Sequence, residues 1–294
     1  MPVLIRSSDM GMLLVATQLR TIRKIGQPLF PLALIGGSDQ HKMEEDENMA
    51  GRIRVGIGGW VYEPWRDNFY PAGLRQKDEL AYVGAHLTAT EINATYYSSQ
   101  KPATFASWAK AVPDGFQFAV KASRYCTNRK VLADAGESIA KFTGQGIVEL
   151  GDRLGPILWQ FMPTKRFDPD DFGAFLRLLP ASVAGVTLRH AVEVRHESFD
   201  DPAFLAMVRD AGVAVVQADH DSYPKIHGHD VGFSYLRLMR TQAEEVAGYP
   251  PAAIADWAGQ LQARVGQGDV FAFFISGAKE RNPAAAQAMI VALK

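Results

Sequence analysis

The stretch Ile53–Trp60 reads IRVGIGGW, a short apolar run that ends in glycines, and it opens a pattern that runs to the C-terminus. From here, short apolar runs alternate with amphipathic stretches, which is typical of βα units that build a parallel sheet. Eight strands are expected, at residues 53–58, 89–93, 116–121, 156–161, 190–195, 213–218, 232–238 and 270–275. Helices are expected at residues 77–86, 103–111, 137–150, 169–179, 202–211, 251–265 and 283–293, with a loop at residues 219–231.

Eight strands between residues 53 and 294 predict a closed parallel (β/α)8 TIM-type barrel, which typically has roughly 250 residues. The main competitor is a doubly wound open α/β sheet, in which a glycine-rich phosphate turn normally follows a strand. The segment Gly56–Gly59 lacks the G-x-G-x-x-G spacing of that turn. Because neither an internal repeat nor a second linker interrupts the pattern, we predict one α/β barrel domain at residues 51–294.

Residues 1–50 differ from the rest of the chain. Two short apolar runs, at residues 10–16 and 28–35, precede an acidic stretch at residues 38–48. A charged segment followed by an apolar one hints at a signal peptide, but the second run contains prolines and ends at Gly36-Gly37 without a small-x-small cleavage site. We therefore expect a poorly ordered, solvated N-terminal extension at residues 1–50.

The composition is that of an ordinary soluble globular protein, with 47% hydrophobic and 21% charged residues, which is enough for a large core. The formal net charge of −1 and the pI near 6.7 argue against a strongly basic nucleic-acid-binding protein. Cys126 is the only cysteine of the chain, which excludes an intrachain disulfide and favours a reducing, cytoplasmic location. No apolar run approaches the roughly 20 residues of a membrane-spanning helix, so no membrane partner is expected.

A series of short motifs lies along the expected strands and their ends. They are Gly56–Trp60, Glu91–Tyr97, Phe118–Ser123, Leu154–Gln160, Glu193–Phe199, Gly212–Asp219 and Tyr235–Arg237. In these motifs, and in their order, the chain resembles the YecE-like family, also called domain of unknown function 72. The resemblance covers nearly all of residues 53–294. It implies a TIM barrel of unassigned function.

Three positions depart from the pattern of the YecE-like family. Members often carry a histidine where this chain has Asn128, a His-Gly pair where it has Leu238-Met239, and paired asparagines where it has Ser276-Gly277. All three lie on the face where a barrel keeps its chemistry. Any activity of better-matched relatives is therefore expected to be altered or lost here.

Barrel active sites lie at the carboxyl ends of the strands, and in this chain polar residues end several strands that are otherwise apolar. A charge at such a place needs a partner or a function, because an unpaired buried ion is costly. The candidate catalytic residues are Glu91, Lys121, Glu193 and Asp219. The candidate ligand-binding residues are Trp60, Tyr62, Asn93, Tyr96, Gln160, Arg195 and Arg237.

Two interpretations of the charged residues stay open. Lys121, Arg195 and Arg237 could form ion pairs with Glu91 or Glu193, or the group could bind a phosphate, a carboxylate or a sugar. A polar pocket is favoured for the group as a whole. For Lys121 an ion pair is favoured over a Schiff base, because nearby carboxylates would keep its amine charged. The aromatic candidates could stack on a sugar or base, or pack a loop over the barrel end.

A functional metal ion is not expected. The histidines that invite a metal-site interpretation are His190, His196, His220, His227 and His229. However, the chain has no H-x-x-x-H on a helix and no Cys/His cluster. Cys126 follows Tyr125 in a loop, and without a neighbouring histidine it is expected to be an ordinary thiol rather than a nucleophile.

Together these observations support a cytoplasmic barrel enzyme, or former enzyme, that binds a small polar or anionic ligand at the C-terminal face of the barrel. Hydrolysis of phosphoester or glycosidic bonds is the reaction class that the carboxylates suggest. The alternatives are a nucleic-acid-binding protein without catalysis and a non-catalytic small-molecule sensor. The sequence assigns no cofactor to any of these functions.

Overall fold

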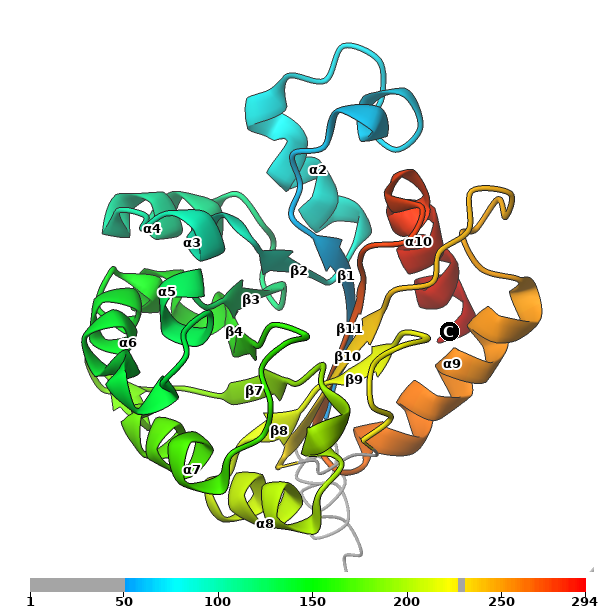
Figure 1. Ribbon diagram of the computed structural model, residues 1–294. Helices are drawn as coiled ribbons and strands as arrows, with labels where there is room; N and C mark the ends of the chain where they lie inside the picture. The colour runs from blue at the N-terminus through cyan, green and yellow to red at the C-terminus, as the bar shows by residue number, and fades with distance from the viewer. Residues whose placement is uncertain (1–50, 227–230) are drawn as a thin grey trace, which may run out of the picture. The chain divides into compact units, whose positions relative to one another are not determined.

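The computed structural model describes residues 51–226 and 231–294. The expected N-terminal extension lies outside these ranges, as do His227 and His229. The described residues belong to a single unit of the fold. In this unit, helices surround a central ring of strands (Figure 1).

The ring is a parallel sheet with the strand order β8-β7-β4-β3-β2-β1-β11-β10-β9. Its strands are β1 (Ile53–Gly58), β2 (Ala89–Ile92), β3 (Gln117–Lys121), β4 (Leu154–Gln160), β7 (His190–Glu193), β8 (Ala214–Val215), β9 (Gln217–Asp219), β10 (Phe233–Leu238) and β11 (Asp269–Phe274). β8 and β9 are two halves of one strand, separated by Val216, whose amide donates to the Val192 carbonyl oxygen at 2.9 Å. Because β8 pairs with β7 and β9 pairs with β10, the sheet closes on itself apart from this interruption. The predicted TIM-type barrel is thereby confirmed.

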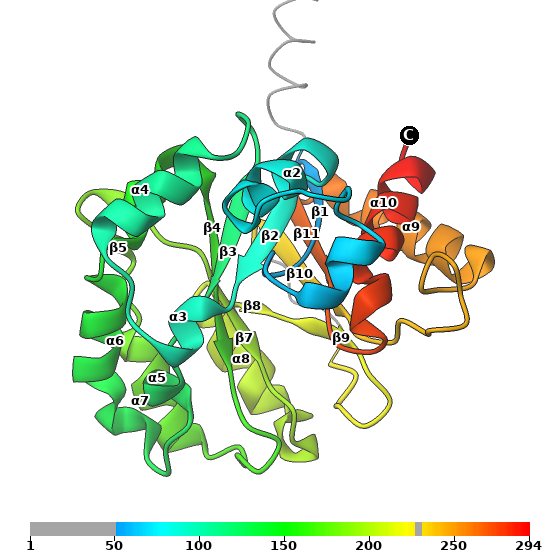
Figure 2. The same ribbon diagram turned by 90° about the horizontal axis from the view of Figure 1, so that it is seen from above.

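The helices that cover the barrel are α2 (Glu79–His86), α4 (Pro102–Lys110), α6 (Gly136–Thr143), α7 (Pro169–Leu178), α8 (Pro202–Asp210), α9 (Pro251–Val265) and α10 (Asn282–Ala292). α4, α7, α8 and α9 begin at a proline, whose missing N–H costs nothing in the first turn. α9 and α10 lie side by side outside the barrel (Figures 1 and 2). None of the helices in the described ranges is long and apolar enough to cross a bilayer.

The helix predicted at residues 137–150 is wrong in its second half. α6 ends at Thr143, and a separate 3-10 segment, η4 (Ile147–Arg153), follows it. Gly146 precedes η4 with φ 107°, a conformation that residues with a side chain rarely adopt. A Cβ atom at Gly146 would also lie 2.7 Å from Pro102 Cα. The apolar pattern continues across this break, and therefore the sequence periodicity does not reveal it.

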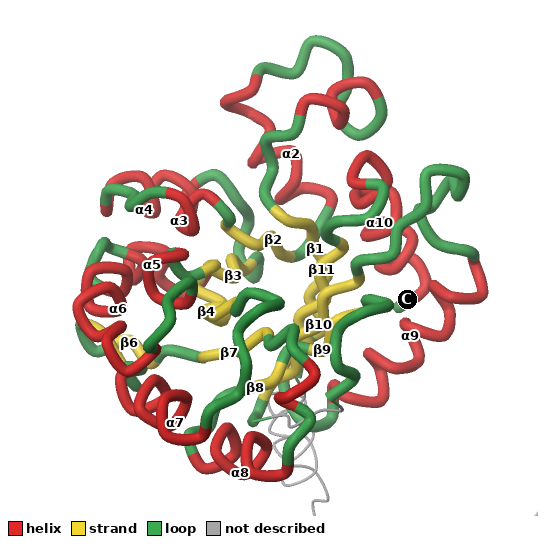
Figure 3. The backbone as a smooth tube through the Cα atoms, in the orientation of Figure 1, coloured by secondary structure: helices red, strands yellow, loops and turns green. Residues whose placement is uncertain are grey.

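The sequence also does not predict several short elements. They are α3 (Ala94–Tyr97), α5 (Arg124–Thr127), the hairpin of β5 (Ser182–Val183) and β6 (Val186–Thr187), and the 3-10 segments η1 (Glu63–Asp67), η2 (Gln76–Asp78), η3 (Leu132–Ala135), η5 (Glu197–Phe199) and η6 (Lys279–Arg281). Each is too short for a periodic apolar pattern to show. Between β9 and β10, the described residues 220–226 contain no helix, as predicted (Figure 3).

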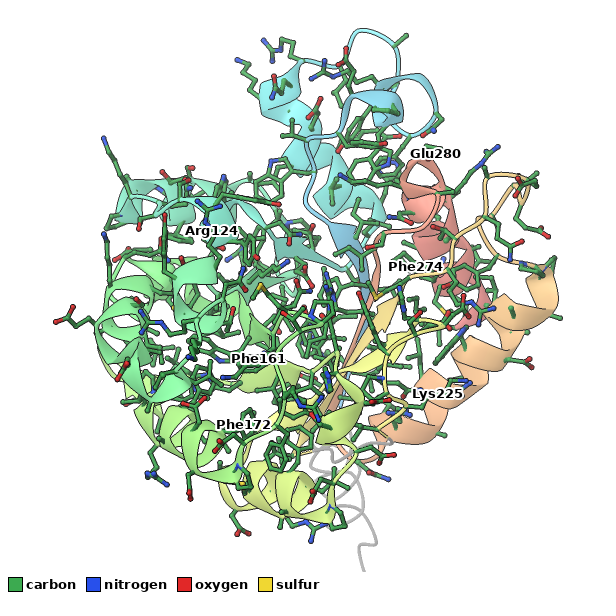
Figure 4. All side chains as sticks on the ribbon, in the orientation of Figure 1. Arg124, Phe161, Phe172, Lys225, Phe274 and Glu280 are labelled. Carbon is green, nitrogen blue, oxygen red and sulfur yellow. The ribbon has the colours of Figure 1, made fainter. Side chains whose placement is uncertain are left out.

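Side chains alternate between the two faces of each strand, so the core has two layers. The outer layer lies between strands and helices and includes the labelled Phe161 and Phe172, whose ring centroids are 5.9 Å apart (Figure 4). The inner layer contains Phe233, Tyr235, Phe271 and Phe273 of β10 and β11, and Ala89, Ala119, Ala191 and Ala214 of β2, β3, β7 and β8. Large rings from two neighbouring strands therefore fill the space that the alanines leave, which makes the interior a packed core rather than a pore.

An ion cluster closes the amino-terminal end of the barrel. Asp269 accepts from Arg54 Nη1 and from Arg189 Nη1, each at 2.9 Å. Arg189 also donates to the Gln117 side chain at 2.8 Å. Both guanidinium groups lie over the Phe271 ring, at 5.5 Å and 5.0 Å from its centroid. This end of the barrel is therefore held by charges that are paired within the cluster.

Candidate functional site

The pleat of the strands brings the predicted polar residues together at the carboxyl end of the barrel. In five strands a polar residue follows an inward-facing core residue by two positions and so faces the same interior. These pairs are Ala89 and Glu91, Ala119 and Lys121, Leu158 and Gln160, Ala191 and Glu193, and Tyr235 and Arg237. We call the layer of Glu91, Lys121, Gln160, Glu193 and Arg237 the barrel mouth.

Arg237 joins the two glutamates of the barrel mouth. Its Nη1 lies 2.5 Å from Glu193 Oε2, and its Nη2 lies 3.2 Å from Glu91 Oε1. Arg237 is 3% exposed and both glutamates are 0% exposed. Loss of one member would leave a buried charge unpaired, which is far costlier than loss of an ion pair in water.

The remaining carboxylate oxygens also have donors. Glu193 Oε1 accepts from Arg195 Nε at 2.7 Å and lies 2.6 Å from Arg195 Nη2, while Oε2 accepts from Gln160 Nε2 at 2.9 Å. Glu91 Oε2 accepts from the Tyr235 hydroxyl at 2.7 Å. Burial alone would raise the pKa of Glu193, but the Arg237 and Arg195 charges outweigh it and lower that pKa to about 2. Glu193 is therefore a fixed anion at ordinary pH.

Lys121 differs from the other charged residues of the barrel mouth. It is 9% exposed, yet its Nζ forms no ion pair or hydrogen bond with any residue that the structure describes. Its contact is the face of the Tyr96 ring, whose centroid lies 4.3 Å from Nζ. Burial, and after it the Arg237 charge, lower the pKa of Lys121 to about 8, although both glutamates oppose the shift. The ion pair expected for Lys121 is not found within the described ranges, because arginines occupy both carboxylates.

Two candidate ligand-binding residues, Asn93 directly after β2 and Tyr96 in α3, support the barrel mouth. Asn93 Nδ2 donates to the Glu91 carbonyl oxygen at 3.2 Å, which fixes the backbone where the strand ends. Tyr96 presents its ring to Lys121 and accepts at its hydroxyl from Asn128 Nδ2 at 2.8 Å. Asn128 therefore orients the ring against which the Lys121 amine lies.

Trp60 and Tyr62 have packing contacts. The Trp60 ring meets Trp108 edge to face at 5.1 Å between centroids, and Tyr62 meets Trp65 in the same way at 5.3 Å. Trp65 is buried and donates from Nε1 to the Lys279 carbonyl oxygen at 2.8 Å. These aromatic residues pack the long segment between β1 and α2, which is the alternative use that the sequence left open.

Asp219 lies apart from the barrel mouth. Its Oδ2 accepts from the Tyr249 hydroxyl at 2.8 Å, and its Oδ1 lies 3.6 Å from Arg240 Nη1. It lines a separate cavity of about 250 Å³ together with His220 and Trp257. No hydrogen bond or ion pair within residues 51–226 and 231–294 joins Asp219 to Glu91, Lys121 or Glu193, and its partner Tyr249 belongs to the outer layer of the core.

The comparison with known proteins agrees with this architecture. The family described as "Protein of unknown function DUF72" matches residues 54–294. The chain belongs to the DUF72 family. A curated relative, UPF0759 protein YunF of Bacillus subtilis (strain 168), is 25% identical over 157 residues, which are 52% of this chain and 54% of the relative. The match thus spans about half the length of that relative.

Crystal structures of two DUF72 family proteins share the fold. The protein from Enterococcus faecalis V583 has 18% identity and a TM-score of 0.65, with 83% of this chain and 98% of that chain covered. The protein from Thermotoga maritima MSB8 has 20% identity and a TM-score of 0.64, with 82% and 98% covered. At these identities the likeness shows the fold and leaves the function open.

His190 and Cys126 of this DUF72 protein are buried in the core. In the described ranges, no three His, Cys, Asp or Glu side chains gather as metal ligands. His190 accepts from Trp159 Nε1 at 3.1 Å and contacts the Pro180 carbonyl oxygen through Nε2 at 2.9 Å, and burial lowers its pKa. Cys126 is fully buried, and burial raises the pKa of its thiol to about 12. The thiol is therefore neutral, as an unreactive cysteine would be.

Two residues of the site were not among the candidates. Tyr235 binds Glu91, and its place two positions before Arg237 on a buried strand is a signal that the period of two could have revealed. Tyr223 lies over the Arg195 guanidinium at 4.8 Å and stacks on His220 at 3.7 Å between centroids. Tyr223 lies in a loop without periodicity, so nothing in the sequence points to it.

The three departures from the YecE-like pattern fall around this end of the barrel. Asn128 donates to the Tyr96 hydroxyl, and Met239 is buried directly after β10. Ser276 follows β11 with a φ of 65°, and its carbonyl oxygen accepts from the Thr241 hydroxyl at 3.2 Å. Met239 and Ser276 thus lie in the loops that follow β10 and β11, and Asn128 contacts Tyr96.

Proposed function

We propose that the barrel mouth binds a small anionic ligand and that Lys121 neutralises the charge of this ligand. The observation that carries the proposal is a buried Lys121 ammonium with no acceptor in the described part of the chain. Taking an ammonium out of water without an anion is costly. A phosphate or carboxylate oxygen would supply the missing acceptor through a short, charge-assisted hydrogen bond.

The charge of the cluster supports an anion. Lys121, Arg195 and Arg237 carry three positive charges, and Glu91 and Glu193 carry two negative charges, which leaves one positive charge when Lys121 is protonated. Arg195 is 16% exposed and directs Nε and Nη2 to Glu193, so that Nη1 has no partner among the described residues. A guanidinium held in this way presents a donor of fixed direction to a carboxylate or a phosphate.

The geometry gives less support to hydrolysis by a pair of carboxylates. Glycoside hydrolysis needs one carboxylic acid whose pKa is raised so that it can donate a proton. Glu193 has its pKa lowered to about 2 by two arginines, and Glu91 shares Arg237 with it. Both glutamates are better suited to orient cations than to exchange protons. We therefore propose ligand binding as the primary function of the barrel mouth. If the protein is an enzyme, we propose that its chemistry takes place at Lys121.

Isothermal titration calorimetry with inorganic phosphate at pH 7 tests the proposal. We expect Lys121→Met to weaken binding about tenfold or more, because a hydrogen bond to a charged group contributes roughly 1.5–3 kcal/mol. Lys110→Met is the matched control, since Lys110 is an exposed lysine at the end of α4 and should leave binding unchanged.

Equal phosphate affinity of the native protein and Lys121→Met would overturn the proposal. So would the absence of phosphate binding combined with salt-sensitive binding of a single-stranded oligonucleotide. That second result would favour the nucleic-acid alternative, because phosphate-tracking proteins release counterions on binding.

A further inference from the structure

The amine of Lys121 has the environment of a nucleophile. Each carboxylate that could hold it as an ammonium already has at least two donors: Arg237 and Tyr235 bind Glu91, while Arg237, Arg195 and Gln160 bind Glu193. What remains beside Nζ is the face of the Tyr96 ring. An aromatic face stabilises a cation less than a carboxylate does and can accommodate a neutral amine.

Nζ is not fully enclosed. The enclosed side-chain nitrogens that lack a partner within the described ranges belong to Arg54, Arg153 and Arg237, and Lys121 Nζ is not one of them. Lys121 is the last residue of β3, at the end of the barrel where active sites of this fold lie. A ligand entering the barrel mouth would therefore meet this amine.

We propose that Lys121 forms a Schiff base with a carbonyl compound that carries an anionic group, an oxo acid, and this inference rests on the anion site proposed above. The anionic group of such a compound would bind Arg195 Nη1, which has no partner among the described residues, and its carbonyl carbon would meet Nζ. The environment of Lys121 reverses the expectation from the sequence, in which nearby carboxylates keep the amine charged.

The reaction needs a neutral amine, and the surroundings of Lys121 provide one. Burial and the Arg237 charge disfavour the ammonium and lower the pKa to about 8. At pH 7.5 roughly a quarter of such amines are neutral, compared with about 0.1% for an exposed lysine of ordinary pKa. Lowered pKa through desolvation or a neighbouring cation is how lysine nucleophiles are activated in general.

The chemical step is balanced without a further reactant. The Nζ lone pair attacks the carbonyl carbon, so that a C–N bond forms and the π bond to oxygen breaks. One amine proton passes to that oxygen and gives a carbinolamine. The hydroxyl group then leaves with the remaining N–H proton as water, and a C=N bond results. Amine and carbonyl thus yield an imine and one water, with no change in oxidation state.

Reductive trapping tests the inference. The native protein is incubated with glyoxylate and cyanoborohydride, and the lysine that carries the carboxymethyl group is located by peptide mass spectrometry. We expect Lys121 to be modified at least about tenfold faster than the exposed Lys110, because its neutral fraction is larger. The rate should rise with pH up to about 8 and level off above it. Inorganic phosphate should slow it by competing for the site.

Lys121→Arg separates this inference from the anion site. Arginine keeps the positive charge but cannot form the imine, so this variant should show no modification above that of the surface lysines, and its phosphate affinity is measured beside that of Lys121→Met. Modification spread over the surface lysines of the native protein, with Lys121 no faster than Lys110, would overturn the Schiff base. If phosphate binding nevertheless depended on Lys121, the anion site would stand without it. If phosphate binding were also independent of Lys121, both proposals would fail.

Discussion

The two ends of the barrel hold ion clusters of similar composition that are completed in different ways. At the amino end, Asp269 pairs with Arg54 and Arg189, and both arginines lie over the Phe271 ring. Every charged side chain of that cluster therefore has an opposite charge within it. Polar residues at this end of a TIM barrel usually serve stability.

At the carboxyl end, the arginines take both glutamates and leave Lys121 without an anion in the described residues. An enclosed Nε without a partner does not distinguish the two ends, since Arg54 and Arg237 each have one within the described ranges. The lysine does. The two ends therefore differ in one respect: every charged side chain of the amino-end cluster contacts an opposite charge, whereas Lys121 at the carboxyl end contacts none among the described residues.

The largest expected effect concerns Arg237. Replacing it with Met leaves Glu91 and Glu193 buried without their shared cation, which should lower the free energy of unfolding by about 3–5 kcal/mol. The matched change at the other end, Arg54→Met, leaves Asp269 paired with Arg189 and should cost only about 1–2 kcal/mol. Urea unfolding measures both. An equal or larger loss for Arg54→Met would contradict the view that the carboxyl end depends on one bridging arginine.

The next effect concerns the stability of the protein without ligand. A lysine whose pKa falls from 10.5 to about 8 on folding carries a penalty on the order of 3 kcal/mol below pH 8. Lys121→Met removes this penalty, so at pH 7 the variant should be more stable than the native protein by about 1–3 kcal/mol. Its advantage should shrink between pH 8 and 10.5, where the native lysine loses its proton. Unfolding curves at several pH values measure the difference.

Lys165 is the control for that change. It is also largely buried, but its Nζ lies 2.7 Å from Asp171 Oδ2 and donates to the Lys130 carbonyl oxygen at 2.8 Å. Lys165→Met should therefore destabilise the protein at pH 7, in the direction opposite to Lys121→Met. If both variants moved stability in the same direction, the distinction between a paired and an unpaired lysine would lose its support.

The sequence predicts the barrel well because its main determinants are local. The apolar run 53–58 is β1 with the predicted bounds, and β11 lies one residue before the predicted 270–275. The ends of helices and strands are harder to predict. The left-handed conformation of Gly146, between α6 and η4, shows why. The conformation of this glycine depends on its close contact with Pro102 at the start of α4. Such a contact does not change the periodicity of apolar residues in the sequence.

The site is predicted less completely because its contacts are not local. The residues of the barrel mouth can be predicted because they lie at strand ends. However, Arg237 binds Glu91, which lies 146 positions earlier in the chain. Which cation pairs with which carboxylate is therefore fixed only when the barrel closes. That pairing leaves Lys121 without an anion among the described residues. Tyr249, which lies in the segment between β10 and α9, donates to Asp219. No strand pattern in the sequence indicates this contact.

The smallest expected effect concerns Asp219. Asp219→Asn changes a pocket that shares no described hydrogen bond or ion pair with Lys121, so phosphate affinity should stay within about twofold. Stability should change by about 1 kcal/mol or less, since the amide can still accept from the Tyr249 hydroxyl. Calorimetric titration reads the affinity. A loss of phosphate binding as large as that of Lys121→Met would mean that Asp219 belongs to the phosphate site.

The most direct measurement of the central claim is the titration of the Lys121 amine itself. Protein with isotopically labelled lysine side chains is followed by NMR from pH 6 to 11, with Lys121→Arg to assign the signal. The account predicts a midpoint near pH 8 in the free protein, which moves upward when inorganic phosphate binds because an anion favours the ammonium. A midpoint at or above 10.5 that phosphate does not move would mean that the Lys121 ammonium is solvated or already paired, and the proposed anion site would be wrong.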